Sequence, residues 1–510
     1  MAITEAEAVA AVNRLLDFGL HKGLLTRRDV NYAANQLLAI LHIPEFQREE
    51  QPCTEDLPEE ILQVLLDYAA EQGIIENTAN ERDLFDPKLM NTIMPRPSEV
   101  ERRFWEAYQQ SPQQATDFFY QLSIASNYIR KARIDKNIAW QTQTDYGALD
   151  ITINLSKPEK DPRDIAKAKT AKASSYPKCL LCCENEGFAG NAHRPARDAH
   201  RLIPLDMYGE PWYLQYSPYT YYNEHCIILN GQHIPMKIDA TTFRNLLHFL
   251  DIFPHYFAGS NADLPIVGGS ILSHDHYQGG RYVFPMERAQ VEQAYTFAEY
   301  PQVRAGRVKW PMSTLRLTSP EKKELIALAA NILQRWRAYN DESLGILAET
   351  EGVPHNTITP IARRRGTDYE LDLVLRNNRT TKEHPLGLFH PHAEVHHIKK
   401  ENIGLIEVLG LAILPARLKT EMAQVKEEWL KGTADIANLP DIAKHAAWYQ
   451  KIRAKHSNVN AQNIETILRQ EIGEVFLEVL HHAGVFKHDT AGIAGFDRFL
   501  TSAGGQAIQA

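Results

Sequence analysis

Apolar residues at the two ends of the chain recur with the three- and four-residue spacing of amphipathic helices. Near the N-terminus, Thr4 and Glu7 form a predicted capping box ahead of the first such segment. Four helices are predicted in residues 1–135, beginning at Thr4, near Thr26, at Ile61 and at Ser98. From Leu418 onward the pattern is again helical, with an apolar stripe over residues 464–476. Neither end carries an obvious chemical motif, so both are expected to be accessory helical regions.

Between these ends the pattern becomes that of strands mixed with helices. The stretch Leu149–Leu155 alternates strictly between apolar and polar residues, which predicts a half-buried strand. Strands are also predicted over residues 212–216, 226–230, 353–363 and 369–376, and helices over residues 239–253 and 320–338. The chain is therefore expected to have an α+β fold, with a change of architecture near residue 135. The charged stretch 157–178 is expected to be an exposed connection.

Length and composition favour a cytoplasmic enzyme of two or three domains. The 510 residues exceed one ordinary core, and they contain no run of about 18 apolar residues that would predict a membrane span. A net charge of −9 argues against a general nucleic-acid binder. The N-terminus lacks the basic start and apolar core of a signal peptide. The five cysteines, an odd number, do not indicate a secreted disulfide framework.

Two cysteines at short spacing indicate a candidate metal site. Cys179 and Cys182 form a Cys-x-x-Cys pair, in which two thiolates from one tight turn can bind the same zinc ion. A redox pair or chance spacing explains the pair equally well on its own. His233 and His274 would complete a set of two cysteines and two histidines if their strands converge. Two neighbours compete for the same role: Cys183 and His225.

The glycine-rich stretch Gly268–Gly280 contains the most informative histidines. The β-forming residues on either side of it predict a strand, on which His274, His276 and Gln278 would share one face. Neutral imidazole is both a metal ligand and a nucleophile. The glycines allow the backbone to approach a phosphate closely. The alternative is that both histidines only form hydrogen bonds within a polar strand.

This stretch resembles the His-x-His-x-His motif of the histidine-triad superfamily of nucleotidyl transferases and hydrolases, with Gln278 in the third histidine's place. That replacement marks the galactose-1-phosphate uridylyltransferases, and residues 261–280 are similar to their second, bacterial sequence family, often called class II. Recognisable motifs cover about residues 176–417. The middle residue departs from the better-known family, because Asp275 stands where that family has proline.

The resemblance implies transfer of a uridylyl group in two displacements. His276 would attack the α-phosphorus of UDP-glucose and release glucose 1-phosphate, and galactose 1-phosphate would then take the uridylyl group to give UDP-galactose. Gln278 would donate hydrogen bonds to the phosphoryl oxygens without activating water. The resemblance also implies two histidine-triad-like antiparallel halves, and we expect a homodimer.

Further site residues follow from the same resemblance, residue by residue. A structural zinc would be bound by Cys179, Cys182, His233 and His274. The substrate would be bound by Asn185, Arg194, Arg197, Asn261, Gly269, Ser270, Ser273, Lys400 and Glu407. In that set a lysine would meet the phosphate and a glutamate the sugar hydroxyls. A second metal is a candidate near His390 and His392.

Four segments are predicted on this basis: a helical region over 1–135, a first half with the nucleophile and zinc over 136–318, a second half with the sugar-phosphate segment over 319–417, and a helical region over 418–510. Two other functions stay open. A histidine-triad hydrolase or phosphorylase of dinucleotides is disfavoured by Gln278, because an amide cannot activate water. A non-catalytic zinc protein for assembly or nucleic-acid binding is disfavoured by the acidic net charge.

Overall fold

The protein has an α+β fold, as its computed structural model shows for residues 3–156, 175–269 and 271–509. The chain forms two compact units. The first contains the residues up to Lys136 together with Ser156–Ile234 and His274–His276, and the second contains Asn137–Leu155, Pro235–Ser273 and Tyr277–Ala510. Most of the predicted connection 157–178 lies outside the described residues.

The first unit begins with the predicted helices. They are α1 (Glu5–His21), α2 (Val30–Leu41), α3 (Glu59–Glu71), α4 (Ala79–Asn91), α5 (Pro97–Tyr108), α6 (Pro112–Ala125) and α7 (Lys131–Ile134). The capping box of α1 is confirmed, because Thr4 accepts the Glu7 amide and the Glu7 carboxylate accepts the Thr4 amide. The start of α5 was wrong by one residue: Pro97 is its first residue, since proline needs no amide partner at that position.

Three antiparallel strands complete the first unit. They are β3 (Ile203–Met207), β4 (Glu210–Tyr216) and β5 (Cys226–Asn230), with β4 in the middle. Helix α6 packs against β4, because the rings of Phe119 and Tyr216 lie 5.2 Å apart and the Tyr216 hydroxyl donates to the Thr116 carbonyl at 3.0 Å. The end of β5 at Asn230 leads directly to the histidine at 233.

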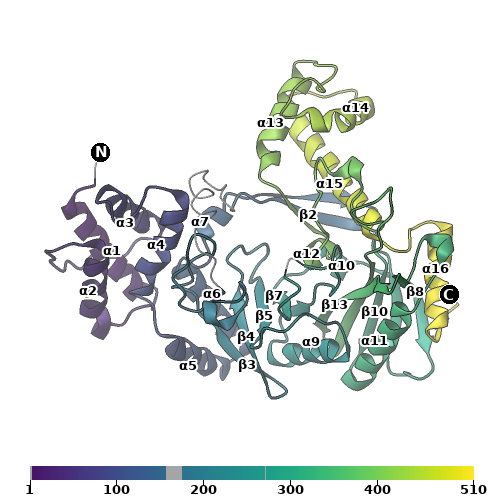
Figure 1. Cartoon of the computed structure of the whole chain (residues 1–510), viewed down its shortest axis with the longest axis horizontal. Helices are drawn as coiled ribbons and strands as arrows, with labels where there is room; N and C mark the ends of the chain where they lie inside the picture. The colour runs from purple at the N-terminus through teal and green to yellow at the C-terminus, as the bar shows by residue number, and fades with distance from the viewer. Residues whose placement is uncertain (1–2, 157–174, 270, 510) are drawn as a thin grey trace. The chain divides into compact units, whose positions relative to one another are not determined.

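The second unit is built on a larger antiparallel sheet. In spatial order its strands within this unit are β16 (Gly505–Ala507), β8 (Val291–Phe297), β9 (Arg304–Val308), β10 (Thr314–Ser319), β14 (Asp368–Asn377), β13 (Asn356–Arg365), β6 (Phe257–Gly259) and, from Tyr277 onward, β7 (His276–Gly280). Helices α9 (Ala240–Ile252) and α11 (Lys322–Arg337) lie side by side against this sheet (Figure 1). The predicted pair of strands is confirmed as the β13–β14 hairpin, although β13 begins at Asn356.

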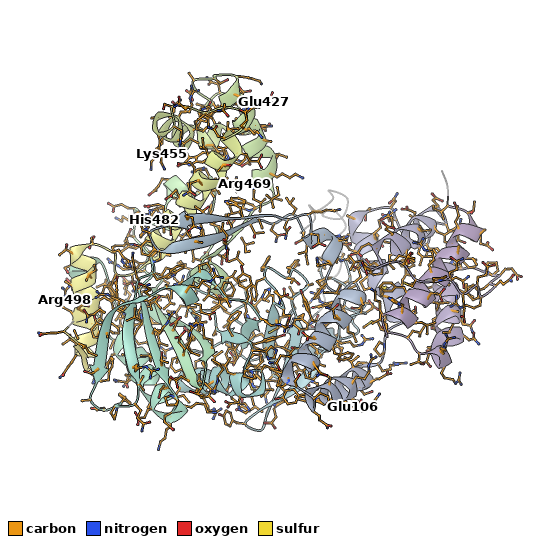
Figure 2. The ribbon with its side chains drawn as sticks, turned by 180° about the vertical axis from the view of Figure 1, so that it is seen from behind. Glu106, Glu427, Lys455, Arg469, His482 and Arg498 are labelled. Atoms are coloured by element: carbon orange, nitrogen blue, oxygen red, sulfur yellow. The ribbon has the colours of Figure 1, made fainter. Side chains whose placement is uncertain are left out.

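A smaller sheet joins the C-terminal helices of the second unit. It contains β1 (Ile138–Thr144), β2 (Gly147–Ile153) and β15 (Leu411–Leu414), with β15 parallel to β2. The helices are α13 (Arg417–Leu430), α14 (Ala446–Lys455), α15 (Ile464–Ala483) and α16 (Thr490–Ser502). Trp140 on β1 donates its indole N–H to the Arg469 carbonyl of α15 at 3.1 Å. In Figure 2, Arg469 and His482 mark two levels of this helix.

The remaining α-helices and strands of the second unit are short. They are α10 (Pro285–Arg288), α12 (Leu405–Val408), β11 (Glu349–Thr350) and β12 (Val353–Pro354). Helix α12 contains Glu407 of the predicted sugar-phosphate segment, which begins at Lys400, and is followed by β15.

Candidate metal centre and catalytic histidine

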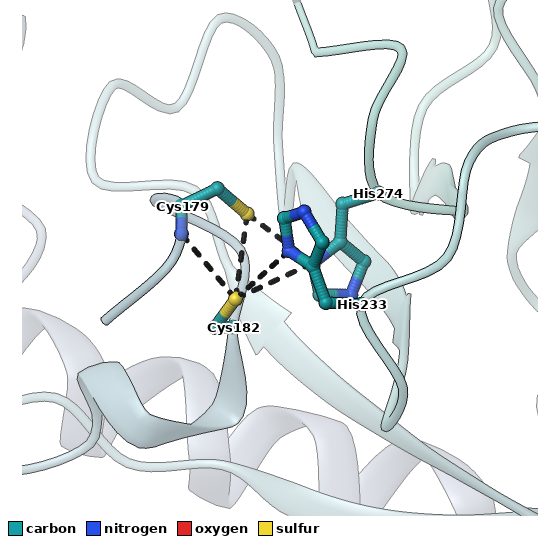
Figure 3. Close-up of side chains that lie close together, drawn as sticks. All are labelled: Cys179, Cys182, His233 and His274. Carbon is teal, nitrogen blue, oxygen red and sulfur yellow. Dashed lines mark hydrogen bonds between the residues drawn. The ribbon is translucent and has the colours of Figure 1, made fainter. Parts of the chain in front are cut away.

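Four side chains of the first unit converge on one point: Cys179, Cys182, His233 and His274 (Figure 3). The Cys179 Sγ lies 3.6 Å from the Cys182 Sγ and 3.2 Å from the His274 Nδ1. The Cys182 Sγ lies 3.2 Å from the His233 Nδ1 and 3.7 Å from the His274 Nδ1. A tetrahedral zinc site has edges of about 3.8 Å between sulfurs and about 3.6 Å between sulfur and nitrogen. The group can therefore hold one metal ion.

The chain builds this group from one turn and two histidines. Asn185 is buried, and its amide nitrogen donates to the carbonyls of Cys179 and Cys182 at 2.8 Å each. The side-chain amide of Asn185 therefore holds the cysteine turn. The sequence predicts that Asn185 binds substrate and does not indicate this contact. The His274 Nε2 lies 2.8 Å from the Asn230 carbonyl. Donation of Nε2–H to that carbonyl leaves a lone pair on the Nδ1 that faces the sulfurs.

The chemistry of the four donors fits a metal ion. Burial raises the pKa of the Cys179 thiol to about 11, because a thiolate there would be poorly solvated and would face a second sulfur. Burial lowers the pKa of His274, which favours the neutral imidazole that metals bind. A cation would compensate two adjacent thiolates. The competing candidates Cys183 and His225 are outside the group, and the Cys183 Sγ lies 3.6 Å from a Glu184 oxygen instead.

His276 is buried, and its protonation is set by a backbone carbonyl. Its Nδ1 lies 2.7 Å from the carbonyl oxygen of His274, so Nδ1–H donates and Nε2 keeps the lone pair. Burial lowers the pKa of His276 to about 4, which keeps the ring neutral near pH 7. Strand β7 begins at His276, so the predicted strand was too long at its start and His274 is free to face the sulfurs. Gln278 follows on the same face of β7 by strand alternation.

In the second unit, the predicted sugar-phosphate segment is organised by Lys399 rather than Lys400. The Lys399 Nζ is buried and lies 2.9 Å from a Glu407 carboxylate oxygen and 3.0 Å from the Ile413 carbonyl. Burial alone would lower the pKa of Lys399, but the negative charges of Glu407 and Glu401 and the hydrogen bonds to them together outweigh burial and raise the pKa. Lys400 is exposed. Two adjacent lysines cannot be distinguished by spacing alone, and only the apolar residue Ile398 next to Lys399 favours the buried choice.

Two more predicted residues, Asn261 and Gly269, lie beside this segment. The Asn261 side-chain oxygen accepts the Leu405 amide at 2.8 Å. A Cβ on residue 269 would lie 2.7 Å from the Asn261 amide nitrogen, so Gly269 allows a close approach that no other residue permits. Ser273 is exposed, and Ser270 lies outside the described residues.

The two predicted arginines lie in the first unit. Arg194 donates to the Lys178 carbonyl at 3.3 Å. The Arg197 guanidinium lies 5.4 Å from the ring centre of Tyr128, which stacks on the buried His200 at 4.5 Å. Neither Tyr128 nor His200 was predicted, because they are far apart in sequence and carry no motif.

The second histidine cluster differs from the predicted one. The His390 Nε2 lies 3.1 Å from the Asn402 side-chain oxygen, and His390 is outside the groups of three or more metal donors that the described residues bring together. His392 instead lies near Glu394 and His482 of α15, with 3.4 Å between the His482 Nε2 and a Glu394 oxygen. Glu394 is mostly exposed, and the His392 Nε2 lies 3.0 Å from the Leu388 carbonyl.

Comparison with known proteins decides the family. Residues 27–235 match the family model for the N-terminal domain of galactose-1-phosphate uridyl transferase, and residues 249–450 match the model for its C-terminal domain. The chain belongs to the galactose-1-phosphate uridylyltransferase family. It is 60% identical to the galactose-1-phosphate uridylyltransferase of Clostridium acetobutylicum, over 96% of this chain and 98% of that one. It is 52% identical to that of Halalkalibacterium halodurans, over 98% and 99% of the two chains.

Membership of the uridylyltransferase family confirms the resemblance seen in the sequence. The alignments with relatives extend over the helical ends as well, which carried no recognisable motif. Among solved structures, yeast Ap4A phosphorylase Apa2 covers 59% of this chain and 89% of its own at 12% identity, and its TM-score of 0.31 is too low to support an argument. Within the described ranges, no helix is long and apolar enough to cross a membrane.

Proposed function

We propose that this chain transfers the uridylyl group of UDP-glucose to galactose 1-phosphate, giving UDP-galactose and glucose 1-phosphate. Its relatives carry the name of this activity and align over nearly its whole length. The observation that carries the mechanism is the buried His276, whose Nδ1–H donates to a backbone carbonyl and whose Nε2 keeps its lone pair. A neutral imidazole in this tautomer is a nucleophile that needs no base.

In the first displacement, His276 Nε2 attacks the α-phosphorus of UDP-glucose. The N–P bond forms as the bond from phosphorus to the bridging oxygen breaks, and glucose 1-phosphate leaves with that electron pair. The hydrogen bond from Nδ1 to the His274 carbonyl stabilises the positive charge that develops on the ring. In the second displacement, a phosphate oxygen of galactose 1-phosphate attacks the same phosphorus, and the electron pair of the N–P bond returns to Nε2.

Gln278 supports the transfer because it is neutral. Its amide donates hydrogen bonds to the phosphoryl oxygens but cannot remove a proton from water. The uridylyl-histidine therefore persists until a sugar phosphate arrives. This role also separates the proposal from a hydrolase of dinucleotides, in which water would be the acceptor.

The metal is proposed to be zinc, bound by Cys179, Cys182, His233 and His274. Four protein ligands leave no open position, so zinc would supply structural stability rather than Lewis acidity. His274 then has two functions: its side chain belongs to the metal group and its carbonyl orients His276. His274 and His276 are only two residues apart, so a metal that fixes the position of His274 would also restrict the position of the nucleophile.

For the sugar phosphate, we propose Lys399 as the cation that meets the phosphate and Glu407 as the group that accepts sugar hydroxyls. Their contact at 2.9 Å fixes both side chains, and Asn261 holds the intervening backbone. Lys399 takes the role that the sequence assigned to Lys400. The homodimer and the cytoplasmic location remain predictions from the sequence, which light scattering and cell fractionation can test.

Incubation with UDP-glucose labelled in the uracil ring tests the proposed function. One uridylyl group should be attached to each chain, peptide mapping should locate it on His276, and glucose 1-phosphate should be released. Addition of galactose 1-phosphate should then discharge the label as UDP-galactose. A label on another residue would reject the mechanism, and release of UMP into water without a sugar phosphate would favour the hydrolase.

A further inference from the structure

Arg376 on β14 is a fully buried arginine in the second unit, with 1% of its surface exposed. One guanidinium nitrogen donates to the Thr359 hydroxyl at 3.2 Å and another to the Ile403 carbonyl at 2.8 Å. The Nε has no hydrogen-bond partner. No carboxylate of the described residues forms an ion pair with Arg376. Glu407 acts on Arg376 only from beyond ion-pair distance. The buried charge is therefore only partly compensated, which is unfavourable and requires an explanation.

Other buried arginines of the same sheet do have carboxylate partners. Arg316 lies 2.7 Å from Asp372, and Arg363 lies 2.8 Å from the same residue and 2.6 Å from Glu370. Both of these arginines therefore have buried carboxylates at ion-pair distance. Arg376 differs from them, although burial lowers its pKa only to about 10 and leaves it protonated at neutral pH.

The contact with Ile403 connects Arg376 to the segment Lys399–Val408. Three buried interactions hold this segment: the Ile403 carbonyl on Arg376, the Leu405 amide on Asn261, and the pair of Lys399 with Glu407. They come from β14, from the loop after β6 and from the segment itself. The backbone on which the phosphate-binding side chains stand is therefore fixed at three points.

The charges around this segment do not balance. Arg376 and Lys399 are buried cations, whereas Glu407 is the half-buried carboxylate that faces them. Glu401 lies 3.6 Å from Lys399 and helps to raise the pKa of that lysine, but 61% of its side chain is exposed, so water weakens its charge and it is not a buried partner. A surplus of one buried positive charge favours the binding of an anion.

We propose that Arg376 is a positioning residue of the hexose-phosphate subsite, which holds the Ile403 carbonyl and supplies the unbalanced charge that favours the dianion of the sugar phosphate. This inference rests on the proposed function. Arg376 acts by holding the backbone of the segment Lys399–Val408, and it does not contact the reacting phosphorus.

Binding of two probes to the full-length protein tests the proposal. Calorimetry with glucose 1-phosphate and with UMP is performed on wild type, Arg376→Gln, Arg376→Lys and the control Thr359→Val. Loss of a charged hydrogen bond weakens binding by about 10- to 100-fold, so Arg376→Gln should lose that much affinity for glucose 1-phosphate and keep its affinity for UMP. Arg376→Lys, which keeps the charge, should lose less. Thr359→Val, which leaves the contact with Ile403, should bind both probes like wild type.

The pH dependence gives a second readout that a purely structural role would not change. The second pKa of a phosphate monoester is about 6, so wild type should bind glucose 1-phosphate more weakly as the pH falls from 8 to 5.5. This dependence should be shallower in Arg376→Gln and preserved in Arg376→Lys. Of the other titratable groups at the segment, Lys399, Glu401 and Glu407 are common to all variants. The pKa of His390 is lowered by burial and partly by Arg376, so the same profiles are recorded in a His390→Asn background, where the difference between variants reports on Arg376.

Circular dichroism and thermal unfolding establish that each variant is folded. A folded Arg376→Gln with wild-type affinity for glucose 1-phosphate, or with equal losses for both probes, overturns the proposal. If Arg376→Gln does not fold, unchanged affinity in folded Arg376→Lys overturns it, because the lysine cannot reproduce both donated bonds. If wild type fails to take up a uridylyl label, the proposed function is rejected but the role of Arg376 is not, because the calorimetry of glucose 1-phosphate needs no uridylyl transfer.

Discussion

Replacement of Cys182 by alanine should remove most of the metal and much of the stability it provides. The Cys182 Sγ has contacts to all three other donors, at 3.6, 3.2 and 3.7 Å, so it occupies a central position in the group. Structural zinc in small domains contributes about 10–16 kcal/mol. If four ligands share this equally, one thiolate accounts for about 2.5–4 kcal/mol, or about two to three powers of ten in metal affinity.

The measurement combines metal content with unfolding. After gel filtration in metal-free buffer, wild type should contain one zinc per chain, as measured by elemental mass spectrometry. A chelator should lower the unfolding temperature of wild type. Cys182→Ala should contain much less zinc, and its lower unfolding temperature should no longer respond to the chelator. Cys183→Ala is the matched control, because its thiol is adjacent in sequence but outside the donor group.

Three results would refute this reasoning. One is full zinc occupancy in Cys182→Ala, which would mean that the four donors do not hold the ion. Another is loss of zinc from Cys183→Ala, which would move the site to the neighbouring thiol. Wild type without any metal, but with normal stability, would likewise show that hydrogen bonds alone maintain the group.

Three further predictions concern other parts of the chain. His276→Gly should reduce the exchange by about 10³-fold or more because it removes the imidazole whose Nε2 attacks the phosphorus; normal exchange by the folded variant would contradict this. Lys399→Met should raise the KM for galactose 1-phosphate by about 10- to 100-fold, whereas Lys400→Met, the exposed neighbour, should change it little; the reverse ranking would restore the original assignment. Asp372→Asn should destabilise the protein by about 3–5 kcal/mol in denaturant unfolding, because two buried arginines lose their shared carboxylate. These arginines oppose the effect of burial and lower the pKa of Asp372 to about 2, so its contribution is complete above about pH 4 and is lost as the pH falls through about 2; equal acid sensitivity of wild type and variant would contradict this.

Local patterns were sufficient for the elements whose causes are local. The capping box at Thr4 was predicted correctly because both partners lie within one helical turn. The hairpin of β13 and β14 was predicted because the strands are adjacent in sequence. The Cys-x-x-Cys spacing likewise places two sulfurs in one turn, and the structure brings them to the two predicted histidines. The four-segment division of the chain remains a prediction.

Roles that depend on distant partners were not predictable in the same way. Asn185, which is predicted to bind substrate, donates to the carbonyls of the cysteine turn, a contact that no local pattern indicates. His390 lies against Asn402, whereas His392 lies near Glu394 and His482. Lys399 is buried and Lys400 is exposed, and nothing in a pair of lysines tells which one turns inward. In each case the residue type was informative, whereas its direction was decided by chain segments that no local pattern brings together.

The protonation of His276 depends on a still finer feature. The sequence identifies a histidine suited to attack phosphorus, but attack requires the proton to be on Nδ1 rather than Nε2. The carbonyl of His274 fixes it there at 2.7 Å, and the side chain of the same residue belongs to the metal group. A backbone carbonyl cannot be changed by substitution, so the chain can preserve the tautomer only by holding residue 274 in place. In the proposed mechanism the two histidines therefore act together: His274 supplies the position, and His276 supplies the nucleophile.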